Sequence, residues 1–285
     1  MTRTPGLLLA LVTSLLTGLA APPAIADETA GAPKRVVSIN LCTDQLAMLL
    51  AAPGQLHSVS HLAGRADASV LADRADAYVA NYGQAEEIFL MQPDLILAST
   101  FTTRATVNLL KRLRFRVVEL PPARSFKHIE ANVARIGQLL GRDAPAAAAI
   151  ADMRRQLATW SAAEQNRVVT GLYYANSYTS GSNTLASEIV SRAGLENLGD
   201  RLGLKGITRL PLELLVTGSP ELLVTGRRFG AAQSRSTEVL EHPALRAATE
   251  DTARALQSDR YWVCGAPFTV RAVRSLARAA RQVVR

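Results

Sequence analysis

The phrase ELLVTGSPELLVTG (residues 213–226) repeats a pattern that the chain already carries as EEIFLMQPDLILAS (residues 86–99). Each phrase opens with a glutamate, has a proline seven residues later, and continues with an acidic residue and a run of Leu, Ile or Val. The two copies are offset by 127 residues. Proline ends a helix, because it has no N–H to donate and disfavours the helical conformation of the residue before it. Each phrase therefore predicts one helix-turn-strand unit, used once in each half of the chain.

Short apolar runs alternate with helical patterns around both phrases. Strands are predicted at 35–40, 57–62, 94–99, 116–120, 168–174 and 221–226 and within 253–264, and helices at 43–50, 84–91, 103–113, 125–140, 185–193 and 211–218 and from about 270 onward. Such alternation predicts parallel sheets flanked by helices. An Ala-rich stretch at 146–164 has apolar residues at helical spacing and predicts one long helix between the halves. The predicted fold class is α/β, with an N-terminal lobe (34–142), an inter-lobe helix (143–166) and a C-terminal lobe (167–285).

The N-terminus has the pattern of a signal peptide. Arg3 precedes an apolar stretch from Leu7 to Ala20, and Ala24-Ile25-Ala26 supplies small residues for cleavage after residue 26. The apolar stretch is short for a membrane span. We therefore predict an exported protein of the bacterial periplasm.

The amino-acid composition limits the classes of function that the protein could have. The 32 Lys and Arg outnumber the 24 Asp and Glu, but the basic residues are scattered and do not interleave with aromatic ones. This pattern favours a basic globular protein, and we predict no nucleic-acid partner.

The chain resembles the periplasmic binding proteins that supply ABC importers of iron–siderophore complexes and cobalamin. The resemblance rests on RVVSIN (35–40) with its following helix, on the paired phrases, and on the long helix. It covers about residues 34–285. It implies a class III binding-protein fold, a monomer with ligand held between two lobes and no catalysed reaction. It also implies that Glu86 and Glu213 dock on a membrane permease. The alternative is that each glutamate only occupies the first turn of a helix, where the helix dipole favours a carboxylate.

Ligands of open α/β sheets bind beyond the carboxyl ends of the strands. Candidate ligand-binding residues of the first half are therefore Asn40, Cys42, Thr43, Tyr82, Phe101, Thr102 and Arg104. Those of the second half are Tyr174, Tyr178, Arg227, Phe229, Trp262 and Cys264. Aromatic surfaces suit a large, partly apolar ligand, and arginines suit anionic groups. The expected ligand is a metal chelate such as a ferric siderophore, a corrinoid or haem, with no resident cofactor.

The two cysteines, Cys42 and Cys264, leave three alternatives open. They form a disulfide that joins the lobes, they are free thiols near the ligand, or they take part in a metal centre. A bridge requires Cα atoms within roughly 7 Å of one another.

Two other functions receive less support from the sequence. A binding protein for bare zinc or manganese needs several converging His and carboxylate ligands, but the four histidines do not follow the predicted strand ends. A secreted hydrolase would be expected to carry a G-x-S-x-G motif and a suitably placed histidine, and neither is found.

Overall fold

The first sheet consists of five parallel strands in the order β3-β2-β1-β4-β5. The computed structural model describes residues 31–161, 168–226, 238, 240, 242–250, 252–257 and 259–283. The strands are β1 (Val36–Ser38), β2 (Leu56–Ser60), β3 (Val79–Asn81), β4 (Leu95–Ser99) and β5 (Val117–Leu120). The helices around them are α1 (Leu41–Leu50), η1 (His61–Gly64), α2 (Ala72–Ala75), α3 (Ala85–Leu90), α4 (Arg104–Arg112) and α5 (Phe126–Leu140).

Both faces of this sheet are covered by helices. Leu95 and Leu97 of β4 point to a core shared with α1 and α5, whereas Ile96 points to a separate core with α3 and α4. A strand buried on both faces is apolar at consecutive positions rather than at alternate ones. This explains why β4 and β1 read as unbroken apolar runs.

The second sheet has four parallel strands in the order β11-β10-β6-β8. The strands are β6 (Val169–Tyr173), β8 (Glu196–Asn197), β10 (Leu222–Gly226) and β11 (Ala253–Gln257), and an antiparallel ribbon pairs β7 (Tyr178–Ser180) with β9 (Ile207–Arg209). The helices are η2 (Ala175–Ser177), α7 (Leu185–Arg192), α8 (Leu198–Arg201), α9 (Leu212–Thr217), α10 (Pro243–Ala248), η4 (Asp259–Tyr261), η5 (Pro267–Thr269) and α11 (Val270–Val283). The predicted α/β fold class with parallel sheets and flanking helices is confirmed.

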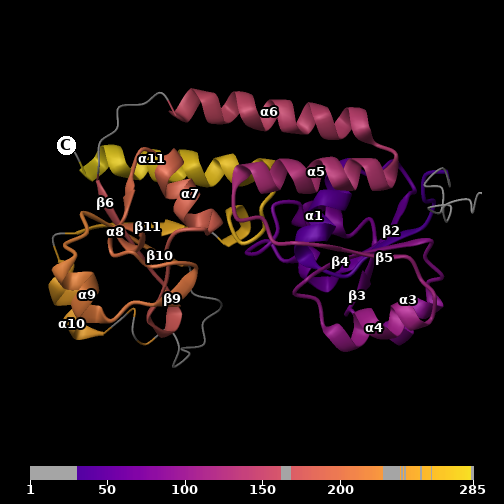
Figure 1. The fold of residues 1–285 in the computed structure, drawn as a ribbon, viewed down its shortest axis with the longest axis horizontal. Helices are drawn as coiled ribbons and strands as arrows, with labels where there is room; N and C mark the ends of the chain where they lie inside the picture. Colours follow the sequence, from indigo (N-terminus) through magenta and orange to yellow (C-terminus); the bar gives the residue numbers. More distant parts are fainter. Residues whose placement is uncertain are drawn as a thin grey trace, which may run out of the picture. The chain divides into compact units, whose positions relative to one another are not determined.

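The long helix α6 (Asp143–Ser161) packs against helices of both sheets. It runs beside α5 of the first half and α11 and α7 of the second (Figure 1). Gly137 of α5 permits this close packing, because a Cβ there would lie 2.5 Å from the Cβ of Ala146. Met153 on α6 is fully buried in the same core.

The repeated phrase forms the same backbone path twice. Gln92 and Ser219, the residues before the two prolines, have φ angles of 47° and 46°. This left-handed conformation ends α3 and α9 and turns the chain into β4 and β10. A following proline disfavours the right-handed helical region at the residue before it, which explains why both helices end there. Its usual effect is an extended conformation, so the left-handed turn is a further feature that the two copies share.

The acidic residue after each proline ties its strand to the first strand of the same sheet. Asp94 accepts hydrogen bonds from the backbone N–H groups of Lys34 and Arg35, which lead into β1. Glu221 accepts one from the N–H of Val169 at the start of β6. The acids therefore satisfy donors at the start of the neighbouring strand, a role that explains their presence in both copies.

Three predicted features differ from the structure. Helix α1 begins two residues before Thr43, because Asn40 accepts a hydrogen bond from Cys42 N–H and is the N-cap. Strand β2 stops at Ser60, which leaves His61 beyond the strand end. The short strands β3, β7, β8 and β9 were not predicted, since segments of two or three residues carry little periodic signal.

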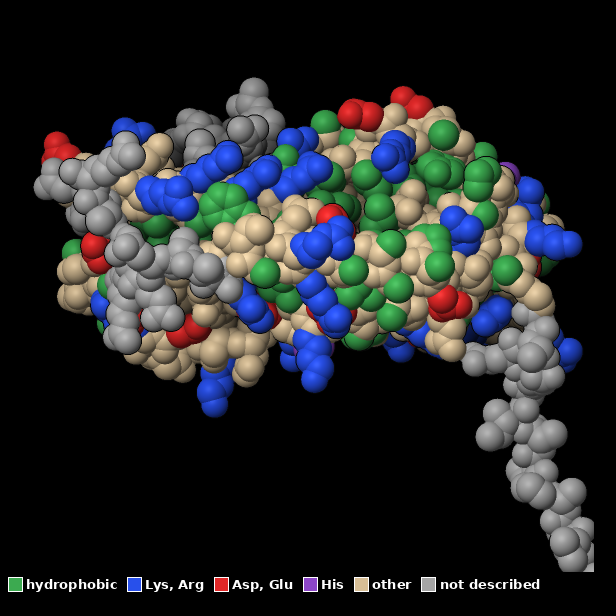
Figure 2. Space-filling model, turned by 90° about the horizontal axis from the view of Figure 1, so that it is seen from above, with side chains coloured by type: hydrophobic (Ala, Val, Ile, Leu, Met, Phe, Trp, Pro, Cys, Tyr) green, Lys and Arg blue, Asp and Glu red, His purple; other side chains and the backbone are tan. Residues whose placement is uncertain are grey.

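Basic side chains are spread over the face that Figure 2 shows, interspersed with apolar and uncharged ones. The exposed arginines of α11 are Arg271, Arg274, Arg278 and Arg281. Within the described ranges, no helix is long and apolar enough to cross a membrane.

Candidate ligand-binding cleft

A cavity of about 760 Å³ lies between residues of the first half and residues of the second. Its lining comprises Phe101, Pro122, Ala123, Arg124, Tyr174, Ser180, Asn183, Thr184, Leu185, Ala186, Lys205, Gly206, Ile207, Trp262 and Val263. This volume falls in the range of small-molecule and cofactor sites, about 300–1,000 Å³. The cavity is the candidate ligand-binding cleft of the protein.

The cleft lies at the carboxyl ends of central strands from both sheets. Phe101 follows β4, and Tyr174 directly follows β6. Successive strands are added first on one side and then on the other side of a switch point, which lies between β1 and β4 in the first sheet and at β6 in the second. Ligands of open α/β sheets bind at such switch points. The structure therefore brings together Phe101, Tyr174 and Trp262 of the predicted ligand-binding set.

Large apolar side chains in the cleft are left in contact with solvent. Phe101 is 80% exposed, Ile207 72% and Val263 58%. The rings of Tyr174 and Trp262 meet edge to face, with centroids 6.2 Å apart. Several exposed apolar side chains gathered in one concavity are typical of a binding site rather than of ordinary protein surface.

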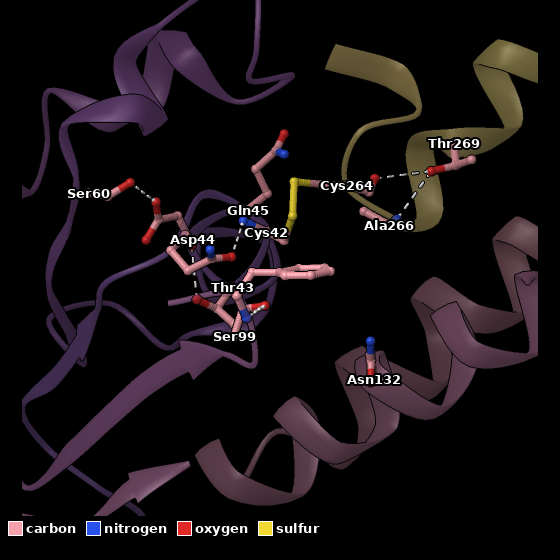
Figure 3. The surroundings of a disulfide bond; sticks show 12 residues. Cys42, Thr43, Asp44, Gln45, Ser60, Ser99, Asn132, Cys264, Ala266 and Thr269 are labelled. Carbon is pink, nitrogen blue, oxygen red and sulfur yellow. Dashed lines mark hydrogen bonds between the residues drawn. A yellow bond between two sulfur atoms is a disulfide. The ribbon is translucent and has the colours of Figure 1, made fainter. Parts of the chain in front are cut away.

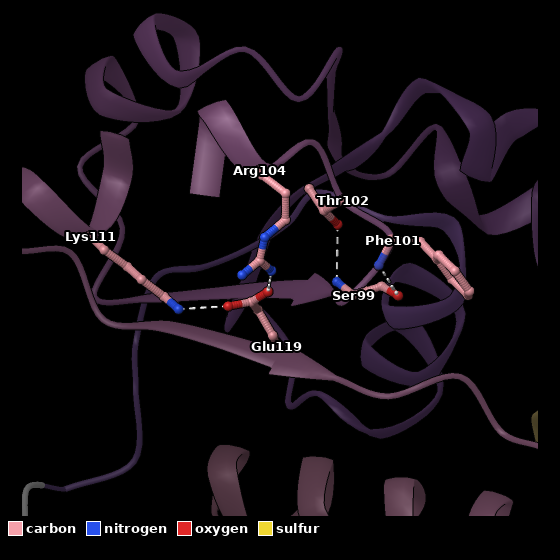
Figure 4. Close-up of polar contacts among 6 residues, drawn as sticks. All are labelled: Ser99, Phe101, Thr102, Arg104, Lys111 and Glu119. Atoms are coloured by element: carbon pink, nitrogen blue, oxygen red, sulfur yellow. Dashed lines mark hydrogen bonds and ion pairs between the residues drawn. The ribbon is translucent and has the colours of Figure 1, made fainter. Parts of the chain in front are cut away.

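The loop that carries Phe101 is fixed by its neighbours (Figure 4). Thr102 Oγ1 accepts a hydrogen bond from Ser99 N–H, and Ser99 Oγ accepts one from Phe101 N–H. These contacts leave the Phe101 side chain free to face the cleft. The Thr102 hydroxyl has a structural role in this turn.

Arg104 lies next to this loop, but its guanidinium pairs with Glu119 at 2.5 Å. Lys111 binds the other carboxylate oxygen of Glu119 at 2.6 Å. The hydrogen bond from Lys111, followed by the charges of both cations, lowers the pKa of Glu119. Arg104 is not among the residues that line the cleft.

Cys42 and Cys264 form a disulfide with a Cα–Cα distance of 5.0 Å (Figure 3). Cys42 is in the first turn of α1, and Cys264 lies two residues beyond Trp262, before η5. Of the three alternatives for these cysteines, the structure has the bridge. It links the two halves covalently, next to the cleft.

Asn40 and Thr43 are engaged in the structure of α1. Asn40 caps the helix, as described above. The Thr43 hydroxyl donates to the carbonyl of Asn40, lies 2.8 Å from Ser38 Oγ, and is buried. Neither residue lines the cleft.

The remaining predicted ligand-binding residues make other contacts or lie outside the described part of the chain. Tyr82, at the end of β3, is exposed and stacks on His61 with centroids 4.7 Å apart. Arg209 lies over the Tyr178 ring at 5.8 Å. Arg227 and Phe229 lie outside the described residues.

Asp44 is a buried acid two residues along α1 from the disulfide. Ser60 Oγ donates to Asp44 Oδ2 at 2.5 Å, while no described group is a hydrogen-bond partner of Oδ1. Burial raises the pKa of Asp44 from 3.8 to about 7, against the lowering effect of its hydrogen bonds. The side chain is therefore a titrating group in the core of the first half.

The family follows from comparison with known proteins. Residues 36–258 match the model of the family described as periplasmic binding protein. The chain belongs to this family. A cobalamin-binding protein of Halobacterium salinarum is 30% identical over 146 residues, which are 50% of this chain and 40% of the relative. The chain thus spans less than half of that relative's length.

Solved structures of binding proteins share the fold. A periplasmic heme-binding protein from Roseiflexus sp. RS-1 superposes with a TM-score of 0.73 at 17% identity, over 88% of this chain and 99% of that one. The periplasmic vitamin B12-binding protein of Vibrio cholerae gives a TM-score of 0.65 at 19% identity, over 89% and 98%. These similarities confirm the predicted two-sheet binding-protein fold.

Glu86 and Glu213 are exposed in the first turns of α3 and α9. Beside Glu86, a depression of about 350 Å³ is lined by Ala85, Phe89, Leu90, Leu109 and Leu113. Both helices also expose apolar side chains, among them Leu90 and Leu214. The repeated phrase therefore presents an acid and apolar surface twice.

Several residues of the cleft escaped prediction. Arg124 comes four residues after Leu120, where the predicted strand ends, and could have been found by extending the search along the segment that follows. Lys205 and Ile207 reach the cleft from the loop before β9 and from β9 itself, an element with no recognisable signal.

Proposed function

We propose that this protein is the periplasmic solute-binding component of an ABC importer and delivers a metal chelate to the membrane permease. The observation that carries the proposal is the aromatic and apolar cleft between the two halves. Phe101 and Trp262 present surface suited to a large, partly planar ligand. Relatives and structural neighbours named for binding cobalamin, heme and vitamin B12 support the same class of cargo.

The bare-ion alternative has less support. Across the described ranges, no group of three or more His, Cys, Asp or Glu side chains is placed to hold a metal ion. A chelate brings its own ligands for the metal and needs only a shaped, partly apolar cleft.

Binding of coloured chelates tests the proposal. Haemin, cyanocobalamin and ferric siderophores are titrated into the purified protein, and absorbance and tryptophan fluorescence are followed. Protein isolated from its native periplasm is also analysed by mass spectrometry and visible spectroscopy for the cargo it retains. Binding of none of these chelates, with no chelate in the native sample, would refute the proposal.

We predict that Trp262→Ala weakens binding of the cognate chelate at least roughly tenfold, because it removes a stacking surface from the cleft. Affinity is measured by absorbance titration. Trp160→Ala is the matched control, since Trp160 lies on α6 and does not line the cleft. If Trp262→Ala and the wild type bind the chelate with equal affinity, Trp262 is not part of the binding site.

We also propose that Glu86 and Glu213 dock on basic residues of the permease. The double change Glu86→Lys with Glu213→Lys should lower uptake in cells at least roughly tenfold, since like charges would then face each other at two points. Chelate affinity of the purified variant should stay the same.

A variant with Asp73→Lys and Glu250→Lys is the control for net charge, because both residues are exposed acids at other positions of the chain. Normal uptake by the Glu86/Glu213 variant would contradict the docking role. Equal loss in both variants would show a general effect of charge.

A further inference from the structure

The charged residues that line the cleft are basic. Arg124 enters from the first half, just before α5, and Lys205 from the second half, just before β9. Among the described residues, no Asp or Glu lines the cleft. In the part of the chain that the structure describes, neither Arg124 nor Lys205 forms an ion pair with a carboxylate.

The second half adds a helix N-terminus to these cations. Thr184, Leu185 and Ala186 line the cleft where α7 begins. Thr184 Oγ1 accepts the N–H of Ser187, but the first N–H groups of a helix have no partner within the helix. The first turn of α7, the positive end of its dipole, therefore lines the same space as Lys205. Glu188 also lies in this turn, but its carboxylate accepts the Phe126 N–H and pairs with Arg192.

The apolar part of the cleft comes from other residues. Phe101 and Val263 supply exposed carbon surface, the half-buried Trp262 adds its ring, and none of the three carries a charge. One cavity thus combines an apolar wall, two cations from different halves and a helix N-terminus. A ligand that matches all three has a flat apolar body with anionic groups at its edge.

We propose that the cleft selects an anionic chelate, whose carboxylate or other negatively charged groups are bound by Arg124 and Lys205. The inference rests on the proposed function and narrows its substrate class: a neutral chelate of the same size would leave both cations without a counter-charge. An anionic ligand that contacts both cations would also hold the two halves together, because each half supplies one of them.

Pairs of chelates that differ in charge test this inference. The first pair is haemin, which has two free carboxylates, and its dimethyl ester, which keeps the ring and the iron. The second pair is ferric enterobactin, which is strongly anionic, and ferrichrome, which is neutral. We expect the anionic member of at least one pair to bind at least roughly tenfold more tightly, the effect of losing charge-assisted hydrogen bonds.

Variants assign the selectivity to the two cations. Arg124→Gln with Lys205→Gln should weaken binding of the preferred anionic chelate at least roughly tenfold and leave its neutral counterpart unaffected. Lys34→Gln with Arg112→Gln removes the same charges from exposed positions away from the cleft and should change neither affinity. Raising the salt from about 0.05 to about 0.5 M should reproduce the loss for the anionic chelate only.

The outcomes separate the two proposals. Equal binding within both pairs, an unchanged Arg124/Lys205 variant, or a clear preference for cyanocobalamin over every anionic chelate would overturn the anionic specificity and leave the chelate-binding function intact. Failure of the wild-type protein to bind any of the five chelates, together with no chelate in the protein isolated from its native periplasm, would overturn the proposed function itself.

Discussion

Replacing both cysteines, Cys42→Ala and Cys264→Ala, is expected to lower the free energy of unfolding by about 5 kcal/mol. The bridge closes a loop of 222 residues, and the entropy that such a link removes from the unfolded chain grows with the logarithm of loop length. Measured values often fall below this chain-entropy limit. Urea denaturation, compared at equal pH, measures the difference.

The wild-type protein treated with a thiol reductant is the matched comparison. It should unfold at the denaturant midpoint of the double variant, and the variant itself should not respond to reductant. An unchanged midpoint in the variant would contradict a stabilising role for the bridge. Because the disulfide lies two residues from Trp262, faster release of bound chelate is expected to accompany the loss of stability.

The second large effect concerns Asp44 and pH. The pKa of Asp44 is about 7 in the folded protein, above its ordinary value of 3.8, because burial disfavours the carboxylate. Between these two values the folded state keeps a proton that the unfolded state has lost. Stability therefore decreases as pH rises from about 4 to about 7, and the total loss is roughly 4 kcal/mol above that window.

Asp44→Asn should remove this contribution. The amide keeps an oxygen to accept the hydrogen bond from Ser60 and never becomes charged. Near pH 4 the variant and the wild type should have similar stability, whereas near pH 8 the variant should be the more stable protein. Urea denaturation across this range measures the difference, and parallel pH profiles for the two proteins would show that Asp44 does not titrate in it.

The sequence determined the α/β architecture through local chemistry. Pro93 and Pro220 keep α3 and α9 from continuing, and the acidic residue after each proline binds backbone N–H groups of the neighbouring strand. Apolar runs at consecutive positions indicate strands covered on both faces. Each of these signals is complete within a few consecutive residues, so the sequence is enough to recognise it, and the family resemblance rests on the same features.

Strand ends were also a sound guide to part of the cleft. Phe101, Tyr174 and Trp262 were selected because they follow predicted strands, and all three line it. Asn40 and Thr43 follow a strand as well, but their side chains bind backbone groups at the start of α1, and Thr43 also lies against the Ser38 hydroxyl of β1. A capping residue and a ligand-binding residue have the same chemistry, and only their partners distinguish them.

Tertiary structure alone decided which distant residues meet. No local pattern connects Cys42 with Cys264, or Arg124 with Lys205, yet the folded chain brings each pair together in one place. The burial of Asp44 likewise depends on residues distant in the sequence. The physical reason is the separation along the chain of the residues that interact. Helix, turn and strand preferences arise from neighbours along the chain, whereas disulfide geometry, desolvation and the charge of a cleft depend on how the two halves pack.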